Sequence, residues 1–215
     1  MGFSRFLALL LDRNSKDIQH QNGNFTAEFE ELWEDVDTDV PWATEAFGVA
    51  PDVANLWIGD ERSVTSLHKD HYENIYYVVA GAKEFTLYPP TDFPFLYERT
   101  YRAATYTRGS EDEDFAVVEN DPPSSVPWLS VDPDRPDYEA YPLFRHATPL
   151  RCVVHAGEAL YLPSLWFHHV KQHADAEGRC IAVNFWYDMQ YDVKYNYYKF
   201  LENLTSLPNA EEAKP

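Results

Sequence analysis

Two blocks of short apolar segments, each closed by a turn, most constrain the fold of this 215-residue chain. Segments of this length and composition predict β-strands. The predicted strands cover residues 55–58, 65–70, 75–79 and 83–88 in the first block, and 150–155, 159–162, 166–171 and 180–187 in the second. Pro89 and Pro90 end the fourth strand, because proline cannot donate a hydrogen bond to a strand ladder. The pattern therefore predicts a mainly β domain.

Helices are predicted on both sides of this β region. Residues 3–12 carry apolar side chains at helical spacing, and residues 25–36 form a second predicted helix that Pro41 ends. Residues 191–207 repeat tyrosine and leucine at the same spacing and predict a closing helix. We expect three parts: an N-terminal helical flank over 1–40, a β domain over 41–190, and a C-terminal helix and tail over 191–215.

A long interruption separates the two blocks of strands. Residues 91–148 hold an acidic run at 111–114 and several prolines. A loop of this length in a compact domain is either functional or disordered. We expect an insertion over one side of the domain, partly ordered by Trp128, Tyr138 and Tyr141.

The charge balance restricts the partners. The chain has 17 basic and 36 acidic residues, a formal net charge of −19. Such a surface repels phosphate backbones, so direct nucleic-acid binding is not expected. It favours a basic protein or peptide as partner, although acidic surfaces also serve solubility alone.

Neither a membrane anchor nor a disulfide framework is expected. The apolar run at residues 6–11 is too short to span a membrane or to form the core of a signal peptide. Cys152 and Cys180 lie in apolar strand-like segments and are expected to be buried free thiols. A reducing compartment follows from this, and we expect the cytoplasm, with the nucleus as a second location.

Two histidines and a carboxylate suggest a metal site. His68 and Asp70 are two residues apart, so on a strand both side chains leave the same face. His168 follows 98 residues after Asp70, on a later predicted strand. This ligand set is that of non-haem ferrous oxygenases, which keep open positions on the metal. Such a triplet is also common by chance.

The sequence around the second histidine is more specific. The string Gly157-Glu-Ala-Leu-Tyr-Leu-Pro163, followed by Trp166 and His168, resembles the distal half of the Jumonji-C family of iron- and 2-oxoglutarate-dependent oxygenases. Further strings resemble the family's lysyl-hydroxylase branch: Val64-Thr-Ser-Leu-His-Lys-Asp-His-Tyr-Glu-Asn74, Tyr161-Leu-Pro-Ser-Leu-Trp-Phe-His-His-Val170 and Ile181-Ala-Val-Asn-Phe-Trp-Tyr-Asp-Met189. The resemblance covers roughly residues 40–207. It implies a double-stranded β-helix of the cupin, or jelly-roll, type with flanking N- and C-terminal helices.

The resemblance also implies roles for individual residues. His68, Asp70 and His168 would hold Fe(II), with 2-oxoglutarate and O2 as cosubstrates. Four further residues match positions that bind 2-oxoglutarate: Thr65, Asn74, Lys83 and Asn184. Each also has an ordinary interpretation, such as a solvated hairpin lysine, a strand threonine, or an asparagine that satisfies buried backbone groups.

One segment departs from the family. Related hydroxylases carry an early strand of the pattern Tyr-x-Gln, whose tyrosine contacts the far carboxylate of 2-oxoglutarate. The matching stretch here is Asp17-Ile-Gln19, and an aspartate would repel a carboxylate. The family also carries a longer segment before this strand, so we expect an incomplete N-terminal sheet edge.

The resemblance implies hydroxylation of a protein side chain, namely a lysine in a GTP-binding protein of the translation-factor class. The acidic insertion offers Asp112 and Asp114 as receivers of that lysine. Two other functions stay open: a metal-binding module with lost or weak catalysis, and a histone lysine demethylase. Proteolysis is disfavoured, because the chain has no nucleophile or zinc-peptidase string. The C-terminal helix is the expected contact of a homodimer.

Overall fold

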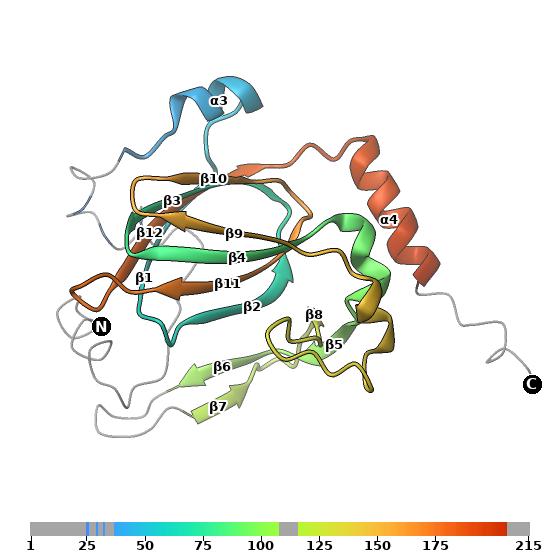
Figure 1. Ribbon diagram of the computed structural model, residues 1–215. Coiled ribbons are helices and arrows are strands. Elements are labelled where there is room, and N and C mark those ends of the chain that lie inside the picture. Colours follow the sequence, from blue (N-terminus) through green and yellow to red (C-terminus); the bar gives the residue numbers. More distant parts are fainter. Residues whose placement is uncertain (1–24, 26–28, 30–31, 33–36, 108–115, 206–215) are drawn as a thin grey trace, which may run out of the picture.

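Two four-stranded antiparallel sheets form the body of the molecule, which is known from a computed structural model (Figure 1). The structure describes residues 25, 29, 32, 37–107 and 116–205. The first sheet has the order β1-β12-β3-β10 and the second the order β2-β11-β4-β9. Their bounds are β1 Val53–Gly59, β2 Val64–Lys69, β3 Tyr72–Ala80, β4 Ala82–Tyr88, β9 Leu150–His155, β10 Ala159–Leu162, β11 Phe167–His173 and β12 Cys180–Asp188. The predicted jelly-roll is confirmed.

Apolar side chains on the inner faces of the two sheets explain why they close over one another. Alternate strand residues point inward, because successive side chains leave opposite faces of a strand. The inner cluster is made of Tyr76, Val78, Phe85, Leu87, Val154, Leu162, Val170 and Ala182. All eight predicted strands correspond to strands of these sheets, so short apolar segments separated by turns were sufficient to find them.

A glycine makes the tight connection between the two sheets: residues 75–79 and 83–88 were expected to form a hairpin around it, but β3 and β4 lie in different sheets and do not pair. Gly81 joins β3 to β4 with a φ of 72°, a left-handed conformation that favours glycine. A Cβ atom at this position would lie 2.4 Å from the carbonyl oxygen of His173 at the end of β11. This connection is therefore packed against the strand that carries the distal histidine.

The helices cover the outside of the barrel. The helix α3, Pro41–Phe47, begins with proline in its first turn, where a missing N–H costs nothing. The prediction that Pro41 ends a helix therefore overlooked that it starts one. The helix α4, Val193–Thr205, follows β12 and packs through Tyr198 against Phe93. The predicted helix at 3–12, most of the one at 25–36, and Asp17 lie outside the described residues.

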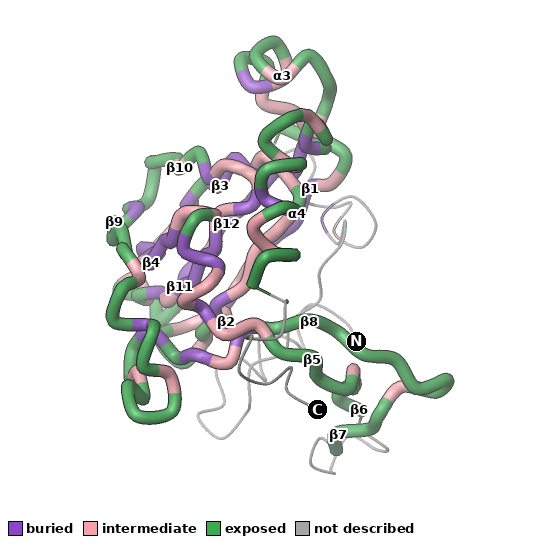
Figure 2. Tube along the Cα trace, turned by 90° about the vertical axis from the view of Figure 1, so that its right-hand side faces the viewer, coloured by how far each residue is buried: buried purple, intermediate pink, exposed green. Residues whose placement is uncertain are grey.

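The interruption between the two blocks is not a loop. It contains two short helices, η2 Pro90–Phe95 and η3 Pro142–His146, and two ladders, β5 Glu98–Arg102 with β8 Ser125–Leu129 and β6 Ala104–Thr107 with β7 Ala116–Glu119. Together the ladders form a ribbon that extends from the barrel beside β2, and most of its residues are exposed (Figures 1 and 2). We call β5 to β8 the ribbon. Its strands escaped prediction because they bury neither face.

Both cysteines are free, as expected, although Cys180 is buried and Cys152 only half-buried. Within the described part of the chain, no helix is long and apolar enough to cross a membrane.

Candidate metal and cosubstrate site

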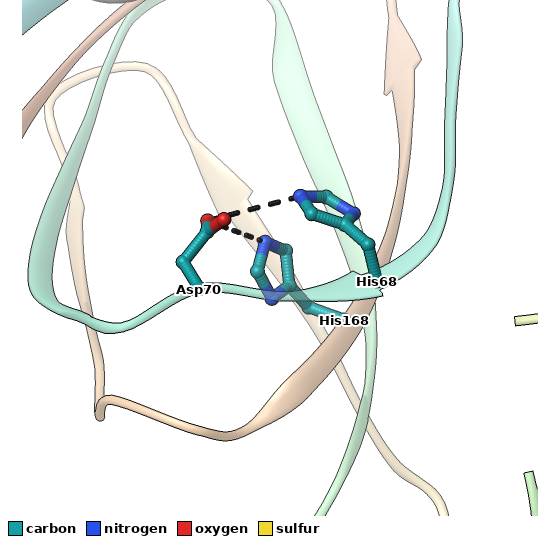
Figure 3. A group of neighbouring side chains, drawn as sticks. All are labelled: His68, Asp70 and His168. Carbon is teal, nitrogen blue, oxygen red and sulfur yellow. Dashed lines mark ion pairs between the residues drawn. The ribbon is translucent and has the colours of Figure 1, made fainter. Parts of the chain in front are cut away.

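Strand pairing places the two histidines side by side. The strands β2 and β11 are antiparallel neighbours, and their register sets His68 directly opposite His168. Asp70 follows the last residue of β2 rather than lying within it, yet its side chain turns to the same point (Figure 3). One ligand from β2, one from the residue after it and one from β11 thus converge, although His168 is far from the other two in the sequence.

The donor atoms fit a single metal ion. One carboxylate oxygen of Asp70, Oδ2, lies 3.7 Å from Nε2 of His68 and 3.6 Å from Nε2 of His168. The three donor atoms all lie within 4.8 Å of one another. Two donors bonded at about 2.1 Å to one ion are separated by about 3 Å when adjacent and by about 4 Å when opposite. The two separations measured from Asp70 lie in this range.

Backbone carbonyl groups fix the orientation of both imidazole rings. Nδ1 of His68 lies 2.8 Å from the carbonyl oxygen of Ser66, and Nδ1 of His168 lies 3.1 Å from that of Trp166. A carbonyl oxygen only accepts, so each Nδ1 carries the proton and each Nε2 presents its lone pair. This is the tautomer that a metal ligand requires.

Burial also keeps the distal histidine neutral. Desolvation, and secondly the neighbouring His68, lower the pKa of His168 to about 4. A neutral imidazole is the form that binds a metal, because a protonated one has no free lone pair. The donor set and its protonation therefore both fit a divalent metal.

The turn before β11 is fastened to the other ligand strand. The backbone N–H of Leu165 donates to the carbonyl oxygen of Asp70 at 2.9 Å. Glu73 accepts hydrogen bonds from the hydroxyl groups of Tyr161 and Ser164 and from the amide of Ser164, at 2.6, 2.8 and 3.1 Å. Leu165 is buried and has a φ of 66°, a conformation that costs a leucine about 1 kcal/mol or more. These contacts fix the turn before β11 and thereby the position of His168.

Lys83 is the predicted carboxylate-binding residue, and it lies deep in the barrel. The register pairs Lys83 of β4 with Gln172 of β11, four residues along the same face from His168, or about 13 Å of strand. Its ammonium donates to the side-chain oxygen of Gln172, whose amide donates in turn to the carbonyl of Asp60 at 2.7 Å. No carboxylate partner is found for it among the described residues. Burial lowers the pKa of Lys83 to about 8.

The other three residues predicted to bind 2-oxoglutarate lie in two places: two are in the barrel interior and one is in the cleft. Asn74 and Asn184 are buried and bonded to one another, Nδ2 of Asn184 donating to Oδ1 of Asn74 at 3.1 Å. Trp57 donates its indole N–H to Asn184 at 2.7 Å. Thr65 is half-buried and lines the cleft outside the metal ligands.

An open cleft of about 730 Å³ leads to the metal ligands. Its lining is largely aromatic, with Tyr72, Trp128, Trp186, Tyr191 and Tyr195 beside His68 and Asp70. Tyr72 and Trp186 stack in parallel, with ring centroids 4.9 Å apart. Asp188 is the acidic residue of this lining besides Asp70. Asp112 and Asp114, the acids expected to receive the substrate, lie outside the described residues.

Three contributors to the site were not found from sequence. Trp128 was expected only to order the insertion, and Gln172 and Glu73 were not singled out. Their partners are His68, Lys83 and Ser164, each 60 or more residues away in the chain. Contacts of this kind depend on strand register, which a single sequence does not reveal.

Comparison with known proteins assigns a family. A profile described as the cupin-like domain matches residues 1–193. The chain is 50% identical over 188 residues to the "bifunctional peptidase and (3S)-lysyl hydroxylase JMJD7" of Homo sapiens, covering 87% of this chain and 58% of the relative. It is also 50% identical over 194 residues to the "lysine-specific demethylase JMJ32" of Arabidopsis thaliana, covering 87% and 56%. A third relative, "JmjC domain-containing protein E" of Dictyostelium discoideum, is 42% identical over 202 residues, covering 87% and 57%. The chain thus spans somewhat more than half the length of these curated relatives.

Proposed function

The chain belongs to the family of cupin-like JmjC domains, and we propose that it is an Fe(II)- and 2-oxoglutarate-dependent oxygenase that hydroxylates a lysine side chain of a protein. The observation that carries the proposal is the pairing of two features on one barrel face. The triad of His68, Asp70 and His168 offers three metal donors, and Lys83 offers a buried cation four residues further along the same sheet.

The ammonium of Lys83 is buried and has no acidic partner among the described residues, which supports a binding site for an anionic ligand. Burying such a charge is costly unless it is paired. A dicarboxylate that chelates the metal through its keto acid end would bring its other carboxylate toward Lys83. Gln172 holds the ammonium in place, and Asn74 and Asn184 supply amide groups to the same interior.

Bound iron and 2-oxoglutarate would supply the oxidation with O2: one oxygen atom converts 2-oxoglutarate into succinate and CO2, and the other converts a C–H bond into an alcohol. The residues of the chain bind and orient. The carbonyl groups of Ser66 and Trp166 keep the Nε2 atoms of the two histidines directed at the metal. The side chains of the barrel core exclude water from behind the triad.

The cleft supports a lysine as substrate. Its aromatic walls suit the aliphatic stem of a lysine and attract its ammonium through the faces of the rings. Asp188 provides an acidic group on the same lining. The net charge of −19 would attract a basic segment from a distance. We take a GTP-binding protein of the translation-factor class as the partner that bears the lysine, a cytoplasmic or nuclear protein, from the resemblance to the lysyl-hydroxylase branch.

A turnover assay tests this proposal. The full chain is incubated with Fe(II), 2-oxoglutarate and a lysine peptide from such a GTP-binding protein, and succinate and peptide mass are measured. We expect a gain of one oxygen that is lost in His68→Ala and Asp70→Ala. His173→Ala is the matched control, because this exposed histidine lies on β11 but pairs with Glu84 instead of the metal ligands.

Each alternative function has its own outcome. Formaldehyde release from a methylated peptide would identify a demethylase, as the name of the Arabidopsis relative suggests. Shortened peptides would identify a peptidase. A folded chain that binds metal but forms no succinate above the blank would leave the non-catalytic metal-binding module.

A further inference from the structure

An aromatic residue of the ribbon lies against one of the metal ligands. Trp128, on β8, stacks in parallel on the imidazole of His68, with an angle of 3° between the rings and 5.5 Å between their centroids. At this separation the parallel rings are offset, which is a preferred arrangement of aromatic pairs. Trp128 keeps 40% of its surface exposed and lines the cleft.

The same tryptophan is also bonded to the residue that orients His68. The indole N–H of Trp128 donates to the hydroxyl oxygen of Ser66 at 3.2 Å. The carbonyl oxygen of Ser66 accepts the Nδ1 proton of His68 at 2.8 Å. Ser66 is therefore held from the ribbon through its side chain, while its backbone holds the metal ligand.

These contacts join the ribbon to the barrel. His68 belongs to the edge strand of the barrel, and Trp128 belongs to a ribbon whose residues are otherwise mostly exposed (Figures 1 and 2). A second contact fixes the ribbon at the same place, because Glu98 of β5 pairs with Lys69 at 2.8 Å. The ribbon is thus attached to β2 on both sides of the strand.

We infer that Trp128 is a positioning residue for the metal ligand His68, so that the ribbon is part of the metal centre. The inference rests on the proposed function, since it requires that the triad holds a metal. The stack restricts rotation of the imidazole, and partners that orient a ligating histidine affect metal affinity. An imidazole that donates to a metal also becomes partly positive, and the face of an indole attracts positive charge.

A metal-binding series tests the inference. Co(II) is titrated into the metal-free full chain, with calorimetry for the dissociation constant and visible absorption for the geometry of the bound ion. Trp128→Leu removes both contacts, Trp128→Phe keeps an aromatic ring without the N–H donor, and Ser66→Ala removes only the hydroxyl. Tyr101→Leu is the control, because this exposed tyrosine lies on the partner strand β5 and bonds to Ser130 instead.

We expect Trp128→Leu to weaken Co(II) binding about tenfold or more, the size of effect known for residues that orient metal ligands. Its Co(II) absorption bands should also shift. Trp128→Phe and Ser66→Ala should each weaken Co(II) binding less than Trp128→Leu does. The double variant Trp128→Phe with Ser66→Ala should bind Co(II) as tightly as the weaker-binding single variant, because both substitutions remove the same hydrogen bond. Tyr101→Leu should bind as the wild type does.

Two results would overturn the inference in different ways. Unchanged affinity and absorption in folded Trp128→Leu, with only a lower melting temperature, would reduce Trp128 to a structural contact and leave the proposed function intact. If Trp128→Leu does not fold, unchanged affinity in both milder variants has the same meaning. A folded wild-type chain that binds no Co(II) would overturn the metal assignment itself, and the inference with it.

Discussion

At the scale of single residues, the role proposed for Lys83 would require a charge that lowers the stability of the fold. Its ammonium is buried and forms no ion pair with a carboxylate among the described residues. Burial lowers its pKa from 10.5 to about 8. A displacement of this size corresponds to about 3 kcal/mol of destabilisation of the folded state at neutral pH. The carboxylate proposed to pair with Lys83 would offset this cost.

Replacement by an uncharged side chain should therefore separate the two properties. We expect Lys83→Met to raise the free energy of unfolding at pH 7 by about 1–3 kcal/mol, while raising the KM for 2-oxoglutarate about tenfold or more. Urea unfolding and succinate assays measure these quantities. Lys171→Met is the control on the neighbouring strand, because Lys171 pairs with Asp134 and Glu84 at the surface and its pKa is raised.

The pH dependence has a definite sign. The unfolded chain binds a proton at Lys83 up to about pH 10.5, whereas the folded chain releases it near pH 8. Stability contributed by this site therefore rises with pH between these values. The advantage of Lys83→Met over the wild type should be largest below pH 8 and shrink above it. An advantage that stays constant to pH 9.5 would contradict the low pKa.

The residues found from sequence differ in kind from those that were missed. His68, Asp70, His168 and Lys83 lie in strings whose residue types suit a metal or an anion, and the structure brings the first three together. Trp128, Gln172 and Glu73 have ordinary types, and only their cross-strand partners give them a role. The sequence could therefore predict the donors, but not the groups that hold them.

At the scale of structural elements, the turn before β11 determines where His168 is placed. We expect Glu73→Gln to lower the melting temperature by a few degrees and to weaken Co(II) binding, because the amide replaces one of two acceptor oxygens that hold this turn. Thermal unfolding and metal titration measure both. Glu158→Gln is the matched control, since Glu158 accepts from the amide of His155 in the β9–β10 turn. An equal loss of metal affinity in the two variants would contradict a specific role of the turn.

The helix α4 is attached to the barrel mainly through one buried tyrosine. Tyr198 packs edge-to-face on Phe93, and its ring lies 5.5 Å from the ammonium of Lys69. We expect Tyr198→Ala to lower the free energy of unfolding by about 3–5 kcal/mol. Tyr106→Ala, an exposed tyrosine of the ribbon, should cost less than about 0.5 kcal/mol. Denaturant unfolding compares the two, and similar losses would contradict the packing of α4.

The elements differ in how far they could be predicted. The central barrel strands β4, β11 and β12 are buried along most of their length, so each reads in the sequence as a short segment with apolar residues between turns. In the ribbon, both faces are solvated, and apolar residues such as Val117, Val118 and Val126 are exposed. Its strands are defined by backbone pairing alone, for which the side-chain pattern has no signal.

At the scale of the whole molecule, α4 presents an apolar stripe on the side opposite to Tyr198. Val193, Tyr197, Phe200 and Leu204 are all exposed and follow one another at intervals of four, three and four residues. This spacing suits a helix that pairs with a second helix. We propose a homodimer through α4. Light scattering should give twice the chain mass of 25.0 kDa.

The dimer is tested by charge on the stripe. We expect Phe200→Glu to give the monomer mass with unchanged circular dichroism, because a carboxylate would be buried in the contact. Lys194→Glu, on an exposed side of the same helix, should leave the dimer intact. A wild-type chain that remains monomeric at high concentration would exclude α4 as a dimer contact.

The hydrogen bond from Leu165 to the carbonyl of Asp70 bears on whether folding precedes metal binding. It joins the two ligand-bearing segments through backbone groups that are not themselves metal ligands. The chain should consequently fold first and bind the proposed iron ion afterwards. If the proposed function holds, iron scarcity would leave a folded but inactive population that could bind iron when the supply returns.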